Sequence, residues 1–586
     1  MLHSAIPPAE SSRRRGPTLR ILALLGAAAG SLGVAALSDA ARASALETGR
    51  LLLWGGLGAL GLALAGWSYG WLRSVSSGNA PGHPAGGSAA RSSPVRPRPR
   101  DLWLLAGALL LAVGLRLPGL DRGLWYDEIT TLVEFVRLPA SDLLRTYTSL
   151  NNHLLYSLLA HGSIGLFGEH VWSLRLPAVA FGVAGVAAVW GVGGRIASRA
   201  EALLAALLVA TSYHHVWFSQ DARGYTGLMF FAMLGTWIFL AALQRRSPGL
   251  WLGYAIVLAL AMYTHLSAVF VFATHALIWV ALGLRERQIG DTRFAGAASL
   301  WPLAGFALGA LLVFDLYALL LPQIVAEFAA KAGVESVEPG VAEWKSPLWT
   351  LLEIVRGLRG GMASWGAALA AAAVGTLGLL DFARRDRVTL ALVVLPPLST
   401  LAALLALGFH IWPRYGVVSL GFAALTVARG TFVAGTWLAR SLGWPQRAAR
   451  GAIAVLGVAA SLASVGANYR LPKQDFEGAR DWLEDQRAPG ERVLTAGLAI
   501  FPYRELYAPA WTPVESAADL ERVRGGSDAS WLVYFSPAHL GAIYPALYRE
   551  IQRRYAVSRE FPGTLGGGTI YVCHSAPAPA DPRPGR

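Results

Sequence analysis

Residues 101–128, DLWLLAGALLLAVGLRLPGLDRGLWYDE, join an apolar run to a pair of adjacent carboxylates. The apolar part, Leu102 to Leu117, is long enough for a short membrane-spanning helix. The carboxylates belong to Asp127 and Glu128, which follow Trp125 and Tyr126. Because Trp and Tyr are enriched at membrane–water interfaces, the plain interpretation is an aromatic belt with two acids facing water. Other polar clusters, expected on the same side of the membrane, weigh against this interpretation.

The composition is that of a polytopic helical membrane protein. Of the 586 residues, 54% are hydrophobic and only 15% are charged, and the mean hydropathy is +0.45. Apolar runs of spanning length recur along most of the chain. Lipid offers no hydrogen-bond partners to a backbone, so we expect these runs to be helices.

The net charge of +14 accompanies arginine clusters in short loops between apolar segments. A basic excess can indicate nucleic acid, but the positive-inside rule produces this distribution as well. We therefore exclude a nucleic-acid partner and place these loops in the cytoplasm. The one cysteine, Cys573, excludes an internal disulfide.

The composition also divides the chain into six segments. In order they are a cytoplasmic tail (1–17), a transmembrane hairpin (18–73), a disordered linker (74–100), a body of membrane helices (101–469), an extracytoplasmic α/β domain (470–575) and a disordered tail (576–586). The linker is rich in Gly, Ser and Pro and cannot form a core. The α/β domain is predicted because three short β-branched or aromatic runs, at Arg492–Ala496, Ser530–Phe535 and Thr569–Cys573, alternate with helical spacing at an ordinary soluble charge frequency.

The predicted helices of the body alternate across the membrane, and every predicted inner loop is rich in arginine. We expect the apolar segment 154–167 to lie at the interface, because spanning would move Arg195 and Arg199 to the outer side. Residues 214–223 and 322–361 are predicted as outer loops. Residues 539–555 are predicted as one amphipathic helix of the α/β domain.

Five polar clusters meet at the outer face under this topology, whereas the inner loops hold almost only arginine. The clusters are Asp127-Glu128, Asn151-Asn152-His153, Gln220-Asp221-Ala222-Arg223, His265, and His410 with Pro413-Arg414-Tyr415. Ionisable groups at membrane depth are costly and are functional hypotheses by default. Neighbouring side chains point in different directions, so we expect one of Asp127 and Glu128 to face a pocket and the other to be held structurally.

These clusters also have structural interpretations. Arg223 is equally suited to pairing with Asp221, since intramembrane ionisable groups often pair with one another. His265, between two helices, is more often an interhelical hydrogen bonder than a ligand. Arg414 at a helix start is more suggestive, because a guanidinium can hold a lipid-linked phosphate through two hydrogen bonds. A divalent metal held by Asp127, Asp221 and the histidines stays an open alternative, although no short ligand spacing supports it.

Four stretches, in this order, resemble the bacterial membrane glycosyltransferases of the GT-C superfamily. They are LRLPGLDRGLWYDE, NNHLLYSLLAHGSIGLFGE, SLRLPAVAFGV and SYHHVWFSQDARGYTGL. The pattern is most similar to protein O-mannosyltransferase-like and lipid A aminoarabinose-transferase-like proteins. The PRY at 413–415 and KQDFEGARDWLE from Lys473 are similar to the same family, and the resemblance covers about residues 101–490. Leu154 replaces a proline that is usual in the family.

The resemblance implies a GT-C fold, with about 11 core transmembrane helices of spanning length. The hairpin of residues 18–73 is an addition to that core. It also implies a polyprenyl-phosphate-linked sugar donor, a hydroxyl acceptor on a lipid, glycan or protein, and a bacterial inner membrane location. Membrane lipids are the remaining expected partners.

The resemblance further implies roles for single residues. Asp127 matches the first-outer-loop acid of the family, the proposed general base, and Glu128 matches its acidic neighbour. Asp221 and Arg223 match a second polar motif near the site. Arg414 and Tyr415 match a motif near the donor phosphate.

From these roles we expect an inverting displacement in which Asp127 deprotonates the acceptor. We expect Arg414 to stabilise the departing phosphate, with Tyr415, Arg223 and Lys331 as further phosphate contacts. The candidate catalytic residues are thus Asp127 and Glu128, and the candidate substrate-binding residues are Asn152, His153, Asp221, His265 and His410.

Two other classes of function fit part of the sequence. A lipid-linked sugar transporter or flippase would explain many helices with polar residues at one face. Transporters usually carry internal repeats and a site at the midplane, and the sequence has neither feature. A non-catalytic envelope assembly factor, whose outer domain binds a partner, is the third interpretation.

Overall fold

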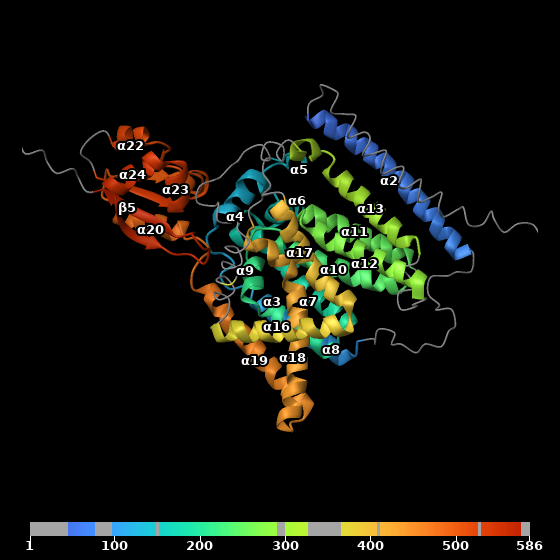
Figure 1. Cartoon of the computed structure of the whole chain (residues 1–586). Helices are drawn as coiled ribbons and strands as arrows, with labels where there is room; N and C mark the ends of the chain where they lie inside the picture. The colour runs from blue at the N-terminus through green and yellow to red at the C-terminus, as the bar shows by residue number, and fades with distance from the viewer. Residues whose placement is uncertain are drawn as a thin grey trace, which may run out of the picture.

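The computed structural model describes residues 45–76, 97–147, 152–245, 247–289, 299–325, 355, 365–406, 411–524 and 529–575. These residues form a body of long helices and a small α/β domain on one side of it (Figure 1). Among them, eight helices are long and apolar enough to cross a membrane, or nine if one bent pair counts as a span. The predicted fold class, a polytopic helical membrane protein with a C-terminal α/β domain, is confirmed.

The eight helices are α2 (Ala45–Ser76), α7 (Val171–Ile196), α10 (Tyr225–Gln244), α12 (Ala268–Ile289), α16 (Trp365–Arg385), α17 (Arg387–Ala406), α18 (Leu420–Leu442) and α19 (Gln446–Val465). The 3₁₀ segment η5 (Pro413–Ser419) leads into α18 and belongs to the same span. The shorter apolar helices are α3 (Pro99–Gly114), α6 (Leu154–Phe167), α11 (Pro248–Thr264) and α13 (Trp301–Tyr317).

The bent pair joins α8 (Arg199–Ala210) to α9 (Tyr213–Ser219) at an angle of 59°. The prediction of a loop over residues 214–223 is therefore wrong for its first part. The hydroxyl of Ser212 accepts a hydrogen bond from the His215 amide and so starts α9. Other predicted segments lie outside the described residues, including 1–17, the first helix of the hairpin, most of the linker, most of the loop 322–361, and 576–586.

The long N-terminal helix α2 lies along α13 (Figure 1). A Cβ atom at Gly56 would lie 1.7 Å from Asp315 Oδ1, so a larger residue there would have to displace the Asp315 side chain. The rings of Trp67 and Trp301 meet with their centres 5.1 Å apart. Small residues let membrane helices approach closely. Helix α2, which belongs to the predicted N-terminal hairpin, is thus packed against α13 of the body.

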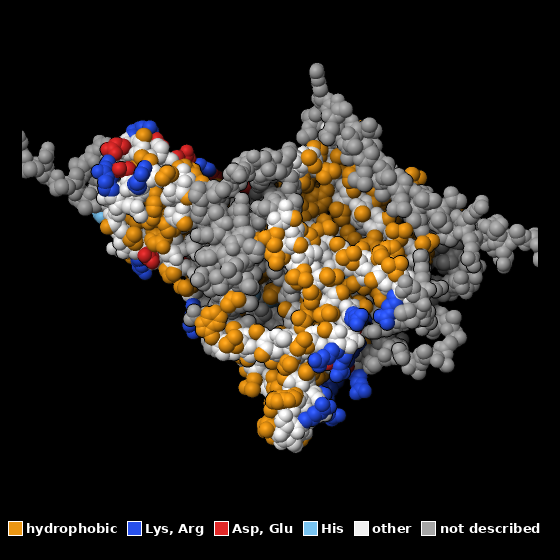
Figure 2. All heavy atoms as spheres, viewed as in Figure 1, with side chains coloured by type: hydrophobic (Ala, Val, Ile, Leu, Met, Phe, Trp, Pro, Cys, Tyr) orange, Lys and Arg blue, Asp and Glu red, His pale blue; other side chains and the backbone are white. Residues whose placement is uncertain are grey.

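An ion-pair cluster within the apolar body joins the helices α8, α16 and α18. Arg429 donates to Glu201 at 2.8 Å and to Asp381 at 2.7 Å. Beside this ion-pair cluster, α16 and α18 pack backbone to backbone. A Cβ at Gly430 of α18 would lie only 1.7 Å from the Val374 carbonyl oxygen of α16. Figure 2 shows Lys and Arg side chains gathered at the lower end of the body, which α18 reaches in Figure 1.

The α/β domain holds a five-stranded sheet in the order β2-β1-β3-β5-β4. Its strands are β1 (Arg492–Ala496), β2 (Thr512–Val514), β3 (Ser530–Phe535), β4 (Ala556–Phe561) and β5 (Ile570–Ser575). β1 pairs in parallel with β2 and β3, and β5 pairs antiparallel with β3 and β4. All residues of β3 are buried, as is typical of a central strand covered on both faces.

The helices of this domain are α20 (Phe476–Gln486), α22 (Ala517–Arg524), α23 (Pro537–Ile543) and α24 (Pro545–Arg554). The prediction of one helix over residues 539–555 is wrong, because the chain breaks between α23 and α24. Pro545 lacks the amide hydrogen and restricts the residue before it, so the first helix ends and a second one begins.

We predict that Gly430→Ala destabilises the helical body. The added methyl group has no room against α16, and overpacking of this kind costs about 1–3 kcal/mol. The measurement is the thermal unfolding midpoint of the purified protein in detergent. Gly457→Ala on α19 is the matched control, because a Cβ there meets nothing within 4 Å. Equal midpoints for the two variants would contradict the described packing of α16 against α18.

Candidate active site

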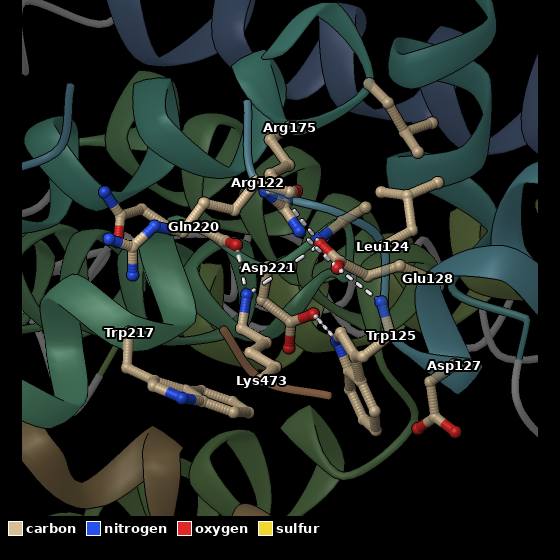
Figure 3. A network of polar contacts seen from close by, with 12 residues as sticks. Arg122, Leu124, Trp125, Asp127, Glu128, Arg175, Trp217, Gln220, Asp221 and Lys473 are labelled. Atoms are coloured by element: carbon tan, nitrogen blue, oxygen red, sulfur yellow. Dashed lines mark hydrogen bonds and ion pairs between the residues drawn. The ribbon is translucent and has the colours of Figure 1, made fainter. Parts of the chain in front are cut away.

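The two adjacent carboxylates stand in a short helix, α4 (Tyr126–Thr130), and their side chains point in different directions (Figure 3). Glu128 reaches back to accept a hydrogen bond from the Trp125 amide at 3.3 Å, which closes the first turn of the helix. α4 continues into a π-helical segment, η2 (Thr131–Val136). Glu128 is fully buried, whereas the Asp127 side chain keeps 14% of its surface exposed.

Glu128 is held by Arg175 of α7. The guanidinium donates to both carboxylate oxygens, from Nε at 2.7 Å and from Nη2 at 2.6 Å. The Ala222 amide also donates to Oε1, at 2.7 Å. Burial by itself would raise the pKa of Glu128, but Arg175 and Lys473 hold that pKa below its ordinary value. Glu128 is therefore an ionised positioning residue whose oxygens are all occupied.

Arg175 also fixes the loop before the motif. Its Nη1 donates to the carbonyl oxygens of Leu120 and Arg122, both at 2.8 Å, and its Nη2 lies 3.3 Å from that of Gly123. One side chain of α7 thus ties down both the loop and α4. The sequence motif SLRLPAVAFGV contains this arginine, but its pattern did not distinguish Arg175 from an ordinary loop-end cation.

Lys473, which comes from the segment between α19 and α20, completes the buried network. Its Nζ donates to the Gln220 carbonyl oxygen, lies 3.9 Å from Glu128 Oε1 and stands 4.8 Å from the centre of the Trp217 ring. Burial lowers the pKa of Lys473 to about 8, against the opposing effect of the nearby carboxylates. The sequence placed Lys473 in a family-like motif and assigned it no role in the site.

Asp221 is part of the same buried network. Its Oδ1 accepts a hydrogen bond from the Trp125 indole at 2.8 Å. Burial raises the pKa of Asp221 to about 6, although Lys473 opposes the shift. Its Oδ2 is buried and has no hydrogen-bond partner among the described residues. The structure therefore brings Asp221 beside the predicted motif, in a position that supports Trp125.

Asp127 faces two arginines from distant parts of the chain. Its Oδ2 lies 3.2 Å from Arg414 Nη1, at the start of η5, and 3.9 Å from Arg223 Nη2, just before α10. The Arg414 side chain is 32% exposed, whereas that of Arg223 is 2% exposed. Of the predicted site residues, these three form one partly accessible cluster.

Two of the predicted histidines, His153 and His265, line the same cluster. His153 Nδ1 accepts a hydrogen bond from the Gly224 amide at 2.7 Å, and its Nε2 lies 3.3 Å from Arg223 Nη2. The His265 ring packs edge to face on the His153 ring, with centres 4.9 Å apart, and stands 6.4 Å from that of Tyr415. Burial and the neighbouring arginines lower the pKa of both imidazoles, that of His265 to about 3. Both rings are therefore neutral at physiological pH.

The other predicted residues divide into two groups. Asn152 is buried beside His153, and its Oδ1 accepts a hydrogen bond from Ser157 at 3.0 Å. Lys331 and His410 lie outside the described residues. Within the part of the chain that the structure describes, no three His, Cys, Asp or Glu side chains come close enough together to hold a metal ion.

The buried network around Glu128 and the accessible cluster around Asp127 differ in net charge. In the buried network, the carboxylates of Glu128 and Asp221 match the cations of Arg175 and Lys473. In the accessible cluster, the single carboxylate of Asp127 faces two guanidiniums, which leaves one excess positive charge. The accessible cluster is thus suited to an anion of one negative charge.

The α/β domain supports the motif from the other side. Gln474 accepts a hydrogen bond from the Tyr126 amide at 3.0 Å, and the Tyr507 hydroxyl donates to the Leu124 carbonyl oxygen at 3.0 Å. The Tyr126 ring contacts Phe501 and Phe535, with ring centres 5.7 and 5.9 Å away. Phe535 ends β3, so the carboxyl edge of the parallel strands contacts the motif directly.

The family model described as dolichyl-phosphate-mannose-protein mannosyltransferase matches residues 152–314. This segment contains His153, Arg175, Asp221 and Arg223. The match confirms the predicted resemblance to GT-C membrane glycosyltransferases over the residues it covers. No curated protein shows a significant sequence match.

Three solved structures of glycosyltransferases are similar to the chain. The oligosaccharyltransferase AglB from Archaeoglobus fulgidus, in complex with an inhibitory peptide and a dolichol-phosphate, is 13% identical over 81% of this chain and 74% of its own, with a TM-score of 0.48. ArnT from Cupriavidus metallidurans, bound to undecaprenyl phosphate, is 14% identical over 82% of this chain and 99% of its own, with a TM-score of 0.44. The arabinosyltransferase EmbB from Mycobacterium smegmatis is 12% identical over 71% and 45%, with a TM-score of 0.41.

We predict that Glu128→Gln destabilises the protein, because it leaves the Arg175 guanidinium buried without its carboxylate. Removing one partner of a buried ion pair costs about 3–5 kcal/mol. The measurement is the unfolding midpoint, together with the yield of folded protein.

Glu169→Gln is the matched control for this prediction, since Glu169 pairs with Arg137 at the surface at 2.7 Å. Exposed pairs contribute about 0.2–1 kcal/mol, so this variant should unfold close to wild type. A Glu128→Gln protein that is as stable as the control, yet inactive, would assign Glu128 to the chemistry instead.

Proposed function

We propose that this chain is a glycosyltransferase that moves a sugar from a polyprenyl-phosphate-linked donor to a hydroxyl acceptor. The observation that carries the proposal is the accessible cluster of Asp127, Arg223 and Arg414, which joins one proton acceptor to an excess positive charge. A sugar phosphodiester carries one negative charge, which this cluster would balance. The family match over residues 152–314 supports the same reaction class.

The reaction needs little from the protein, because a polyprenyl phosphate is already a good leaving group. The acceptor oxygen forms a bond to the anomeric carbon as the bond from that carbon to the phosphate oxygen breaks. Asp127 takes the hydroxyl proton, a contribution of about 10²–10⁴-fold. Arg414 and Arg223 stabilise the charge that stays on the departing phosphate. One displacement from the opposite face inverts the anomeric carbon.

The surrounding residues position this chemistry. Glu128 holds α4 in place through Arg175, so that Asp127 is presented to the cluster. His265 is neutral and therefore suited to a hydrogen bond with a sugar hydroxyl rather than to holding charge. Both ring nitrogens of His153 already face protein groups, so this neutral ring would act by positioning Arg223 and the Gly224 amide. Asn152 Nδ2 is buried without a partner among the described residues, which supports a substrate-binding role.

Some predicted roles rest on the sequence alone. Tyr415, beside Arg414, stays a candidate contact to the donor. Lys331 and His410 stay candidates for the phosphate and the substrate. A divalent metal also stays open as a cofactor.

We place the cluster on the extracytoplasmic side of a bacterial inner membrane. The arginines that gather at the other end of the body support this orientation, because the positive-inside rule puts such ends in the cytoplasm (Figure 2). The cytoplasmic ends would include Arg199 at the start of α8, Arg385 at the end of α16 and Arg440 in the last turn of α18. The α/β domain would then be extracytoplasmic.

We predict that Asp127→Asn abolishes sugar transfer and leaves the protein folded. The general base is lost, so the rate should fall by about 10²-fold or more. The assay offers the protein in nanodiscs a panel of polyprenyl-phosphate-linked sugars with a membrane-lipid extract, and measures the release of polyprenyl phosphate.

Asp121→Asn is the matched control, because Asp121 is an exposed acid near the motif that accepts a backbone hydrogen bond from Trp172. This control should release polyprenyl phosphate at the wild-type rate. An active Asp127→Asn protein would remove Asp127 from the proposed role. Binding of a donor without release by wild type would favour a lipid-sugar transporter.

A further inference from the structure

We propose that Arg414 exchanges partners during the reaction cycle. In the protein without donor it pairs with Asp127, and in the donor complex it turns to the phosphate and leaves Asp127 open to the acceptor. The inference rests on the proposed function. It makes Arg414 the link that prepares the base only when a donor is bound.

The geometry around Asp127 gives the first reason. Arg414 Nη1 and Arg223 Nη2 both approach the same carboxylate oxygen, Oδ2, at 3.2 and 3.9 Å. A hydroxyl that loses its proton to a carboxylate must stand about 2.6–3.2 Å from it. Arg414 Nη1 fills that distance at Oδ2, so an acceptor hydroxyl that approaches this oxygen competes with the guanidinium.

The two arginines are not equally free to move. Arg223 is almost completely buried, and Nη1 and Nη2 lie 3.4 Å from the Thr131 hydroxyl and 3.3 Å from His153 Nε2. Arg414 is about one-third exposed and lies over the Trp412 ring, 5.1 Å from its centre. A cation over an aromatic face keeps its attraction while it turns, because the interaction has no fixed hydrogen-bond direction. Arg414 is therefore the cation that can turn toward an incoming phosphate, whereas Arg223 stays in place beside the cluster.

The charges make the exchange favourable. A guanidinium binds a phosphate through two parallel hydrogen bonds, which are stronger than a single contact to a carboxylate oxygen. Arg223 stays beside Asp127 after Arg414 has turned, so the carboxylate is not left without a counter-charge. The donor phosphate and Asp127 thus compete for Arg414, and donor binding precedes acceptor activation.

Competition for Arg414 predicts that loss of the Asp127 carboxylate strengthens phosphate binding. Replacing Asp127 with Asn should strengthen phosphate binding, because Arg414 no longer has to leave a charged partner. We expect Asp127→Asn to bind undecaprenyl phosphate about fivefold more tightly than wild type, the effect of an ion pair worth about 1 kcal/mol. Asp121→Asn removes the same charge away from Arg414 and should bind as wild type does.

The test is a double-mutant cycle on undecaprenyl phosphate binding in nanodiscs, with Arg414→Gln and the double variant alongside. Arg414→Gln should weaken binding, and Asp127→Asn should bring no gain in that background. A gain of the same size in both backgrounds would mean that Asp127 acts by charge alone, and would overturn the exchange. No gain in the single variant would overturn it as well.

The same experiment separates this inference from the proposed function. If wild type binds undecaprenyl phosphate and Asp127→Asn binds no more tightly, the exchange fails and the glycosyltransferase proposal stands. If wild type and Asp127→Asn both fail to bind undecaprenyl phosphate, the donor class itself is wrong. If Arg414→Gln shows no binding, recovery of binding in the double variant would contradict the exchange, and its absence would support it.

Discussion

The site depends on one buried ion pair, between Glu128 of α4 and Arg175 of α7. Removing two charges from water costs desolvation free energy, and the pair is stable only because nearly every polar atom has a hydrogen-bond partner. The Arg175 side chain also binds the carbonyl oxygens of the loop before α4, and the Ala222 amide binds Glu128. The pair therefore fixes the direction of α4 and the segment before α10 together. Asp127 and Arg223 face each other because of this buried contact, which no substrate needs to touch.

The α/β domain also holds the site in place, as the membrane helices do. Lys473 enters the buried network from the segment that begins the domain, and Tyr126 packs against Phe501 and Phe535. In open α/β sheets, the carboxyl ends of parallel strands commonly hold a ligand. Here the carboxyl edge of β1 and β3 contacts the motif of the membrane body. The domain thus supports the site by packing against it. Its sequence contains no phosphate-binding glycine loop, so we do not assign a phosphate site to the domain itself.

Much of this fold follows from the sequence, because hydrophobic length and periodicity determine membrane helices directly. The segment 154–167 matches α6 in its bounds, and the strands at Arg492–Ala496 and Ser530–Phe535 match β1 and β3. The pattern failed at Pro545, where the helical spacing continued through a break in the chain. It also missed the short or exposed strands β2 and β4, which lack a clear alternation. In the site, the sequence predicted that the adjacent side chains of Asp127 and Glu128 point in different directions. It did not identify Arg175 and Lys473 as partners of Glu128, because only the folded chain brings them together.

The central claim is that a polyprenyl phosphate binds at the cluster of Asp127, Arg223 and Arg414, on the side of the body that carries the α/β domain. The most direct measurement is a cryo-EM structure of the full chain in nanodiscs with undecaprenyl phosphate. The account predicts the phosphate within hydrogen-bond distance of the Arg414 guanidinium, with Glu128 still paired with Arg175. A phosphate bound instead among the arginines at the opposite end of the helices would contradict the account.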